Sequence, residues 1–447
     1  MSKIKSKQSF IVGAFIISLG GFISKLLGAV YRIPLTNILG GKGMGIYQMV
    51  YPLYCILLTV SASGIPTGIA RLISSGKAFG VEKTALKLYG IIGLLGSALM
   101  YMLSAPLSYA MQENAVQFCC KALSPAVFFV SVLSVIRGYF QGKGNMIPTA
   151  VTEISEQAVK VAIGCIFAYV NRANLTRAVA STLFAVTLAE GVTTIGAIFY
   201  YLGHSTEVKP LFKPKQAPVL AILKYTIPLT FTAIAMPLSQ LLESVVAVRL
   251  LKQITQNATA IYGVYSGCAL TIINLPVSVT YGLAAASVPQ ISPLAAKGNM
   301  ALAKRKAYKA LLITLAISFP CSVALYFLSP VAANLIFKNL SASEKTLLIN
   351  LVKIMAINAV TSSLVQTSSA CITALGKPFK STISQWVSSF LRVILTALLI
   401  KFTSLSILGA AISANCAYLV AVILNFWYII REGAHHENNA YRFRNGR

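Results

Sequence analysis

The chain has 447 residues, of which 56% are hydrophobic and only 11% are charged, and its 38 Lys and Arg far outnumber its 10 acidic residues. This composition excludes an ordinary soluble globular domain. The net charge of +28 could suggest a nucleic-acid-binding protein, but the basic residues are spread through short loops rather than gathered in one cluster, so nucleic acid is not an expected partner. We therefore predict an all-α polytopic membrane protein.

Twelve apolar stretches are long enough to cross a bilayer as helices, because about 20 apolar residues span its hydrocarbon core. We expect these helices near residues 9–31, 46–71, 86–110, 116–138, 149–170, 178–202, 222–250, 258–287, 308–330, 346–373, 381–401 and 404–430. Twelve spans put both termini on one side, and Lys and Arg are more frequent on the segments of that side. The sequence thus predicts a multi-pass plasma-membrane protein with both termini in the cytoplasm.

The longest hydrophilic stretch divides these helices into two sets of six. We expect an N-terminal lobe at residues 1–203, a cytoplasmic linker at 204–218 and a C-terminal lobe at 219–430. Residues 431–447 are polar, rich in Asn and without periodicity, so we expect a disordered cytoplasmic tail.

Short similarities recur in the same order in the two halves. Residues 97–104 resemble 322–329, and Gly142-Lys143 ahead of Pro148 resembles residues 376–378. A six-helix repeat keeps the same orientation in the membrane, so the two lobes should be related by an axis along the membrane normal, with the substrate path between them.

The residues that usually carry catalysis or bind metals do not form a recognisable pattern. The eight cysteines fall mostly inside apolar stretches without metal-type spacing, and His204, His435 and His436 lie in a loop and in the tail. The sequence contains no nucleophile elbow, phosphate-binding loop or paired-acid motif. We expect neither an enzyme nor a metal site.

Several predicted spans carry a basic residue on a face lined by small residues. Lys25 and Arg32 share a face with Gly21 and Gly28 in the first span. A cation buried at membrane depth costs at least a few kcal/mol, so such a stripe should face a polar cavity that receives an anion. The alternative is that Arg32 extends to the membrane interface and the glycines serve only close helix packing.

Two further basic residues are candidates for binding the same anion. Arg71 shares a face of the second span with Ser61, Gly64 and Gly68, and Arg137 lies at the inner end of the fourth. Arg71 could instead act only as a cytoplasmic topology signal, and Arg137 only as an anchor at the interface.

Acids inside the predicted spans are few, because all ten acidic residues are Glu. Glu153, Glu156 and Lys160 share one face of the fifth span, and Glu156 four residues before Lys160 is the favourable order for an ion pair. We interpret this pair as structural, because unpaired buried charges are costly. Glu190, near the middle of the sixth span, has no basic partner in its own helix.

Glu243 is the only acid within a predicted span of the C-terminal lobe. Its carboxylate could hold Na⁺ or H⁺ together with neighbouring hydroxyls, or it could pair with Arg392 or Lys353. No other cofactor is expected, so Na⁺ or H⁺ is the one candidate coupling ion.

Longer motifs point to a known family. They are Ser24–Thr36 (SKLLGAVYRIPLT), Gly45–Tyr54 (GIYQMVYPLY) and Arg137–Gly142 (RGYFQG), followed by Pro148-Thr149 and Glu156-Gln157. With these motifs the sequence resembles the stage V sporulation protein B branch of the MOP flippases, which are relatives of the MurJ lipid II flippase. The resemblance runs over most of the chain and is clearest in its first 160 residues.

The resemblance implies a two-lobed bundle with a central cationic cavity, which moves undecaprenyl-pyrophosphate-linked sugars to the outer leaflet by alternating access. Three features depart from the MurJ pattern. Tyr31-Arg32 stands in place of an Arg-Asp pair, the eighth span contains no Arg, and the sequence lacks two C-terminal helices that form a lipid-tail groove in some relatives. The departures leave open how this protein would hold the lipid tail.

We predict a flippase for an undecaprenyl-pyrophosphate-linked saccharide, and we favour lipid II in peptidoglycan or spore-cortex synthesis. A flippase for another lipid-linked oligosaccharide, such as a capsule unit, is the close alternative. A cation-coupled multidrug exporter would need acids rather than bases along its path, and a non-transporting sporulation scaffold would need no cavity charges. The expected partners are the lipid-linked saccharide and membrane lipids, and we expect a monomer that could associate with cell-wall synthesis enzymes.

Overall fold

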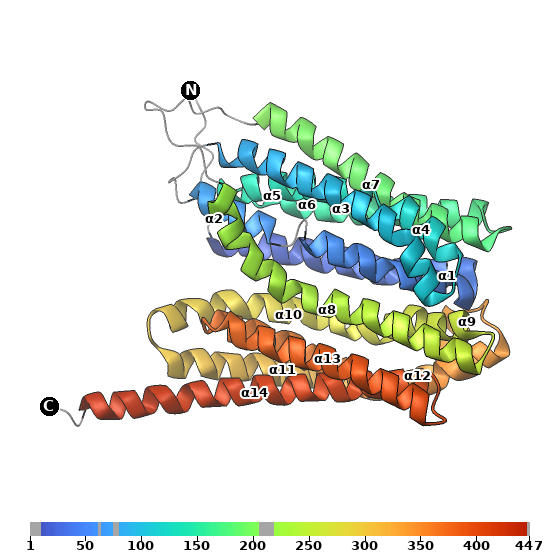
Figure 1. Ribbon diagram of the computed structural model, residues 1–447. Coiled ribbons are helices and arrows are strands. Elements are labelled where there is room, and N and C mark those ends of the chain that lie inside the picture. Colours follow the sequence, from blue (N-terminus) through green and yellow to red (C-terminus); the bar gives the residue numbers. More distant parts are fainter. Residues whose placement is uncertain (1–9, 61–63, 75–79, 205–218, 445–447) are drawn as a thin grey trace. The chain divides into compact units, whose positions relative to one another are not determined.

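The computed structural model describes residues 10–60, 64–74, 80–204 and 219–444, with a few side chains in α1, α8 and α14 left out. All regular structure in this part of the chain is helical (Figure 1). The chain divides into two compact units, Met1–Arg249 and Leu250–Arg447, and each is described by itself below.

The first unit contains seven helices and most of an eighth. They are α1 (Phe10–Leu58), α2 (Ile65–Ser74), α3 (Val81–Met111), α4 (Ala115–Leu123), α5 (Ala126–Gly142), α6 (Ile147–Val170), α7 (Leu175–His204) and α8 (Val219–Ile254). Helix α6 packs against both α1 and α7, and α5 packs against α2, α3 and α7.

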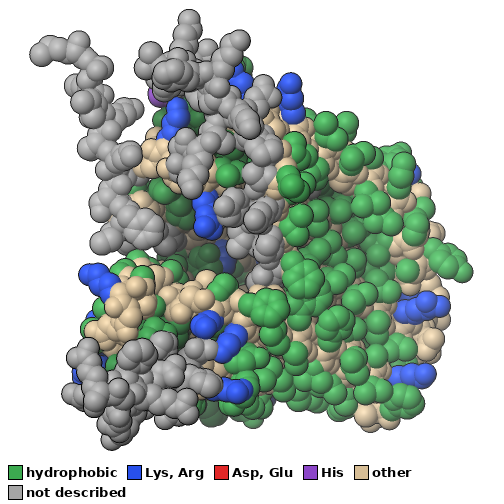
Figure 2. All heavy atoms as spheres, turned by 60° about the vertical axis from the view of Figure 1, so that its left-hand side comes forward, with side chains coloured by type: hydrophobic (Ala, Val, Ile, Leu, Met, Phe, Trp, Pro, Cys, Tyr) green, Lys and Arg blue, Asp and Glu red, His purple; other side chains and the backbone are tan. Residues whose placement is uncertain are grey.

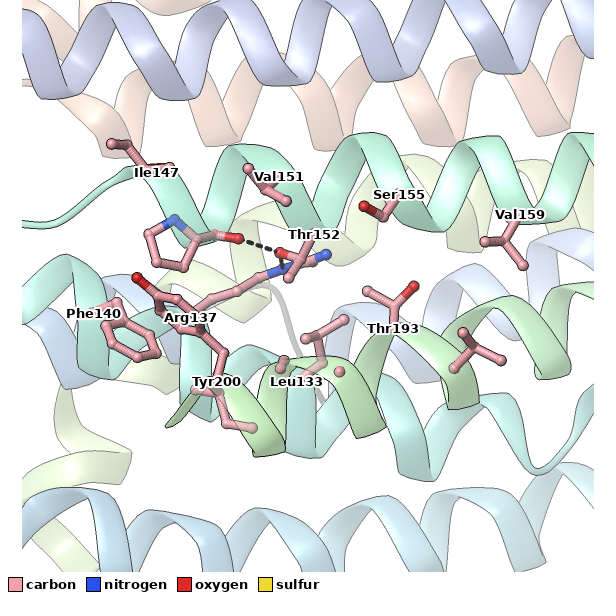
Figure 3. A pocket seen from close by; sticks show the side chains of 15 residues that line it. Leu133, Arg137, Phe140, Ile147, Val151, Thr152, Ser155, Val159, Thr193 and Tyr200 are labelled. Atoms are coloured by element: carbon pink, nitrogen blue, oxygen red, sulfur yellow. Dashed lines mark hydrogen bonds between the residues drawn. The ribbon is translucent and has the colours of Figure 1, made fainter. Parts of the chain in front are cut away.

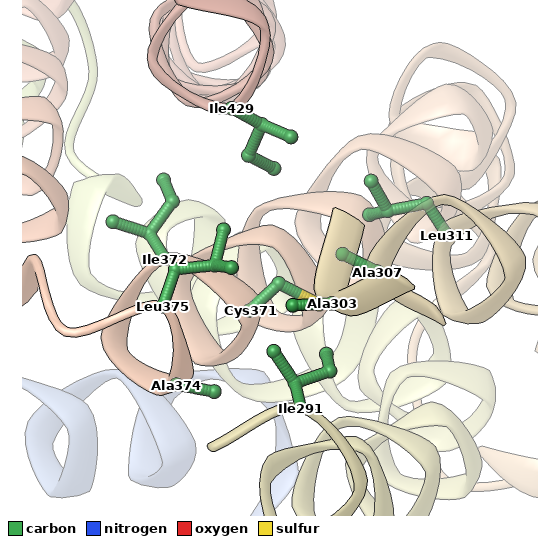
Figure 4. Packing of buried hydrophobic residues seen from close by; sticks show 9 residues of the cluster. All are labelled: Ile291, Ala303, Ala307, Leu311, Cys371, Ile372, Ala374, Leu375 and Ile429. Atoms are coloured by element: carbon green, nitrogen blue, oxygen red, sulfur yellow. The ribbon is translucent and has the colours of Figure 1, made fainter. Parts of the chain in front are cut away.

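The second unit begins near the end of α8. It contains α9 (Ala258–Gly263), the π-helical segment η2 (Val264–Ala269), α10 (Leu270–Ala296), α11 (Met300–Ile336), α12 (Ala342–Ala374), α13 (Pro378–Phe402) and α14 (Leu408–Arg444). Its largest contacts join α12 to α10, α11 and α14, and α13 to α14. Small residues such as Ala303 and Ala307 allow α11 to approach α12, where they meet Cys371 in a buried apolar cluster (Figure 4).

Nine segments among the described residues are long and apolar enough to cross a membrane. Helix α6 is not among them, because Glu153, Glu156 and Lys160 lie near its middle. Figure 2 shows apolar side chains covering the helix sides on the face in view, with several Lys and Arg side chains at the margins of this surface. The prediction of an all-α polytopic membrane protein is confirmed.

The predicted second span differs most from the structure. The stretch expected at residues 46–71 forms the end of α1 and then α2, and residues 61–63 between them lie outside the described part. Helix α1 itself continues from the first predicted span across a kink at Gly40, whose φ of 66° favours glycine. Pro66 lies in the first turn of α2, where a missing N–H costs nothing.

The predicted lobe boundaries stay a prediction. The linker expected at 204–218 falls almost entirely outside the described residues, and the two compact units divide at Arg249 rather than there. Helix α14 continues as far as Arg444, so it extends into the tail expected to be disordered. A helix that has already formed adds one hydrogen bond for each further residue, which favours this continuation over a break at residue 430.

Candidate functional site

Arg137 is positioned by two glycines of its own motif. A Cβ atom at Gly138 would lie 2.9 Å from the Pro66 Cα, and one at Gly142 would lie 3.0 Å from the Ala70 Cα. The glycines therefore let α5 pack closely on α2. The glycines of the motif face α2, whereas the Arg137 side chain extends toward α6. The motif thus combines small residues for one helix contact with a cation for the other.

The guanidinium of Arg137 contacts two side chains of α6. Its Nε donates a 2.8 Å hydrogen bond to Thr152 Oγ1 (Figure 3). Its Nη2 lies 3.2 Å from Glu156 Oε2. The Thr152 hydroxyl in turn donates to the Pro148 carbonyl at 2.8 Å. The side chains of Arg137 and Glu156 are only 13% and 18% exposed. The alternative that Arg137 serves as an anchor at the membrane interface stays a prediction.

The ion pair of Glu156 differs from the predicted one. The sequence favours Lys160 as the partner, whereas the structure pairs Glu156 with Arg137 and places Lys160 in longer-range electrostatic interaction with it. Arg137 can bond Thr152 and Glu156 together because its donors form a rigid fork. The other carboxylate oxygen of Glu156 accepts a 3.2 Å hydrogen bond from Gln157 Nε2.

Glu190 in α7 joins this group of charges, although the sequence did not mark it as a site residue. Its side chain is 2% exposed, and Oε1 accepts a 3.2 Å hydrogen bond from the Tyr54 hydroxyl. Its carboxyl group interacts with Glu156, Arg137 and Lys160, and Oε2 has no hydrogen-bond partner among the described residues. The available signal was an acid in the middle of an apolar span.

Lys25 and Arg32 extend the group onto α1. Lys25 is exposed and attracts Glu153 of α6. Arg32 is half-buried and repels Lys160, which carries the same charge. A Cβ atom at Gly28 would lie 3.4 Å from the Gln157 side chain, so this glycine serves the packing of α1 on α6. We call Lys25, Arg32, Arg137, Glu153, Glu156, Lys160 and Glu190 the charge network.

Arg71 is not part of the charge network, although its helix α2 packs on α5, which carries Arg137. It occupies the last turn of α2 with an exposed side chain, and its carbonyl accepts a 3.1 Å hydrogen bond from the Ser74 hydroxyl. Helix α2 packs on α5 and α3. Of the residues expected to share its face, Ser61 lies outside the described part.

Glu243 and Arg392 fall in different compact units, so their predicted pairing stays a prediction. Glu243 in α8 is 2% exposed. Arg392 in α13 is 6% exposed, and its Nη2 donates a 3.1 Å hydrogen bond to the Tyr265 hydroxyl. Glu243 is not the sole helical acid after residue 219, because α12 begins earlier than expected and includes Glu344 in its first turn as part of a capping box.

The arrangement can exchange ionic partners. Arg137 forms a direct ion pair with Glu156, and Lys160 is attracted to Glu156 and Glu190 at longer range. Both cations lie inside an apolar helix bundle, where charges attract more strongly than in water. An anionic ligand could replace a carboxylate as the partner of such a cation.

Comparison with known proteins finds relatives of this chain in Bacillus subtilis (strain 168). The chain is 26% identical over 304 residues to stage V sporulation protein B of Bacillus subtilis (strain 168), covering 64% of this chain and 59% of that protein. It is 22% identical over 458 residues to lipid II flippase MurJ of the same organism, covering 95% of this chain and 83% of MurJ. The matched stretch thus spans less than two thirds of the sporulation protein.

Solved structures show the same fold. A multidrug resistance MATE family transporter of the MOP superfamily, in its inward-facing conformation, has a TM-score of 0.79 and 17% identity, and the match covers 95% of this chain and 99% of the transporter. A MOP superfamily transporter from Pyrococcus furiosus has a TM-score of 0.71 and 19% identity, with 95% and 96% coverage. The model of the family described as "Polysaccharide biosynthesis protein" matches residues 10–295, and the chain belongs to this family.

Proposed function

We propose that the chain is a flippase that moves an undecaprenyl-pyrophosphate-linked saccharide across the plasma membrane, and that lipid II is its substrate. Membership of a polysaccharide biosynthesis family supports a saccharide substrate. The similarity to a protein named lipid II flippase over 95% of the chain favours lipid II within that class. Both termini lie in the cytoplasm in this proposal.

The charge network is the observation that carries the proposal. Four cations, Lys25, Arg32, Arg137 and Lys160, lie with three carboxylates on helices of an apolar bundle. The cations exceed the carboxylates by one, so the network suits an anionic rather than a cationic ligand. A pyrophosphate could compete with Glu153 for Lys25 and with Glu156 for Arg137.

If the pyrophosphate replaces carboxylates as the partner of the cations, substrate binding can be coupled to a conformational change of the protein. With no substrate present, Glu156 pairs with Arg137, and Glu153 and Glu190 compensate part of the charge on Lys25 and Lys160. When the pyrophosphate binds, the carboxylates lose their partners, which favours their protonation or movement. The membrane potential can contribute, since each net charge moved across it is worth about 2.3 kcal/mol per 100 mV.

We propose Na⁺ or H⁺ as the coupling ion, held at a buried carboxylate. Glu190 and Glu243 are both 2% exposed. The unpartnered Oε2 of Glu190 supports ion or proton binding in the first unit. Glu243 is the carboxylate that the sequence analysis named as a candidate site for Na⁺ or H⁺.

Rescue of a cell depleted of its own lipid II flippase tests the substrate. We expect the wild-type chain to restore growth, Lys25→Ala and Arg32→Ala to fail, and Lys87→Ala to succeed. Lys87 is an exposed lysine of α3 that lies outside the charge network, so it controls for the loss of a positive charge. Failure of the wild-type chain at normal membrane level would reject lipid II and favour another lipid-linked oligosaccharide.

A further inference from the structure

A groove of about 410 Å³ runs between α5, α6 and α7 in the first unit (Figure 3). Its wall on α6 extends from Ile147 to Val159, which corresponds to roughly 18 Å at the rise of an α-helix. Most of the lining is apolar. Val151 of α6 and Val192 of α7 are 54% and 55% exposed. They lie at the open edge of the groove, which we call its apolar lip.

The polar side chains of this groove lie between apolar ends. Arg137 is the only charged lining residue, and it lies with Thr152 on the side where α6 begins, next to the apolar side chains of Ile147 and Phe140 (Figure 3). Ser155 and Thr193 come next, from α6 and α7, and Val159 lies at the far end (Figure 3). The groove therefore suits a ligand with a polar group and a hydrocarbon chain.

The Thr193 hydroxyl is a buried hydrogen-bonding group that no described residue satisfies. Thr193 is 6% exposed, yet its hydroxyl has no hydrogen-bond partner among the described residues. The hydroxyl of the adjacent Thr194, by contrast, donates to the Phe129 carbonyl at 3.1 Å. Because a buried hydroxyl without a partner costs free energy, an acceptor in the groove would be favourable here.

Gly196 keeps the groove open. It lines the groove in the interior of α7, and no atom lies within 4 Å of the position that its Cβ would occupy. Glycine inside a helix costs about 1 kcal/mol relative to alanine, so its presence there is not favoured by the helix itself. Close helix packing does not explain it either, because the space beside it is empty.

We propose that a phospholipid of the surrounding bilayer binds in this groove, with its phosphate at Arg137, an ester oxygen at Thr193 and an acyl chain over the apolar end at Val159. The planar fork of arginine suits a phosphate, and Arg137 can keep its bond to Glu156 while another donor binds the lipid. Lys143, which caps α5, adds positive charge near the same end. The exposed apolar lip contacts lipid chains in a membrane, so the ligand is already present there.

The site shares Arg137 with the charge network, but its occupancy by phospholipid can be measured without the transport substrate. It can be tested by native mass spectrometry of the purified full chain after exchange into phosphatidylglycerol-containing micelles. Gly196→Phe fills the groove, and Gly90→Phe in α3 is the matched control, because Gly90 is also a helical glycine with no atom within 4 Å of its Cβ position. Thr193→Val removes only the hydroxyl and keeps the shape.

We expect Gly196→Phe to abolish the bound phosphatidylglycerol and Gly90→Phe to retain it. Thr193→Val should weaken binding about fivefold, as the loss of one hydrogen bond implies. A diacylglycerol of the same chain length, which lacks the phosphate, should bind at least about tenfold more weakly, because an arginine–phosphate contact is lost.

Equal lipid occupancy in the wild type and Gly196→Phe would overturn the proposal, as would equal loss in Gly90→Phe. Should Gly196→Phe fail to fold, Thr193→Val still decides, since unchanged affinity in that variant contradicts the assigned contact. Equal binding of diacylglycerol would reject the phosphate at Arg137.

Discussion

Arg137 of α5 and Glu156 of α6 form an ion pair, with 3.2 Å between Nη2 and Oε2, within a helix bundle that is otherwise largely apolar. The pair connects two helices that make few other contacts with each other, because the groove of Figure 3 lies between them. It therefore has both a structural role and a place in the charge network.

A double-mutant cycle should separate this pair from the one that the sequence suggests. We expect a coupling free energy of about 1–2 kcal/mol between Arg137→Ala and Glu156→Ala, and less than about 0.5 kcal/mol between Lys160→Ala and Glu156→Ala. The reason is that Glu156 contacts Arg137 directly and Lys160 only at longer range. Thermal unfolding of the purified variants in one detergent measures both values. Equal coupling of the two pairs would show that Lys160 is a direct partner.

Gly164 should tolerate no side chain. A Cβ atom there would lie 2.9 Å from Tyr31 Cζ, and the Tyr31 ring is buried between α1 and α6. We expect Gly164→Ala to lower stability by about 1–3 kcal/mol through overpacking.

Gly90→Ala provides the comparison for this prediction. No atom lies within 4 Å of its Cβ position, so alanine should leave stability unchanged or raise it by up to about 1 kcal/mol. Thermal unfolding of the two variants under the same conditions checks both. If Gly164→Ala were as stable as Gly90→Ala, the packing of α1 on α6 would differ from that described.

Apolar length and composition were enough to predict the helices and the membrane class. The expected span at 149–170 coincides with α6 to within two residues, because Pro148 marks its start and a continuous apolar face follows. The separation of α1, which ends at Leu58, from α2, which begins at Ile65, was not predicted, because averaged hydropathy gives no weight to the Ser and Gly residues between them.

The site was predictable in its residue types but not in its pairings. Arg137 and Glu156 were both identified, yet the spacing rule favours a partner four residues away in the same helix. A contact between α5 and α6 depends on tertiary packing, which single-sequence periodicity does not contain. Glu190 was missed as a site residue for the same reason, because its contacts with Tyr54 and Glu156 come from other helices.

Coupling should depend on a buried carboxylate. We expect Glu190→Gln or Glu243→Gln to abolish the Na⁺ or pH dependence of transport while leaving a component driven by the membrane potential, because Gln keeps the shape and removes the charge that a cation requires. Initial rates in proteoliposomes at varied Na⁺ and pH measure this. Glu344→Gln, which changes a half-buried residue of a helix capping box, is the control. Unchanged ion responses in both buried variants would reject these carboxylates as coupling sites.

Transport of lipid II by the purified chain in proteoliposomes, followed as lipid accessible on the opposite leaflet, is the most direct test of the proposed function. We expect the wild type to transport, Lys25→Ala and Arg32→Ala to lose at least about 90% of the rate, and Arg71→Ala to fall as well, because each loses a cation for the pyrophosphate. Lys25→Arg should retain more activity than Lys25→Ala, and Lys87→Ala should match the wild type. Wild-type rates in all three cation variants, at equal protein reconstitution, would contradict the assignment of these cations to pyrophosphate binding.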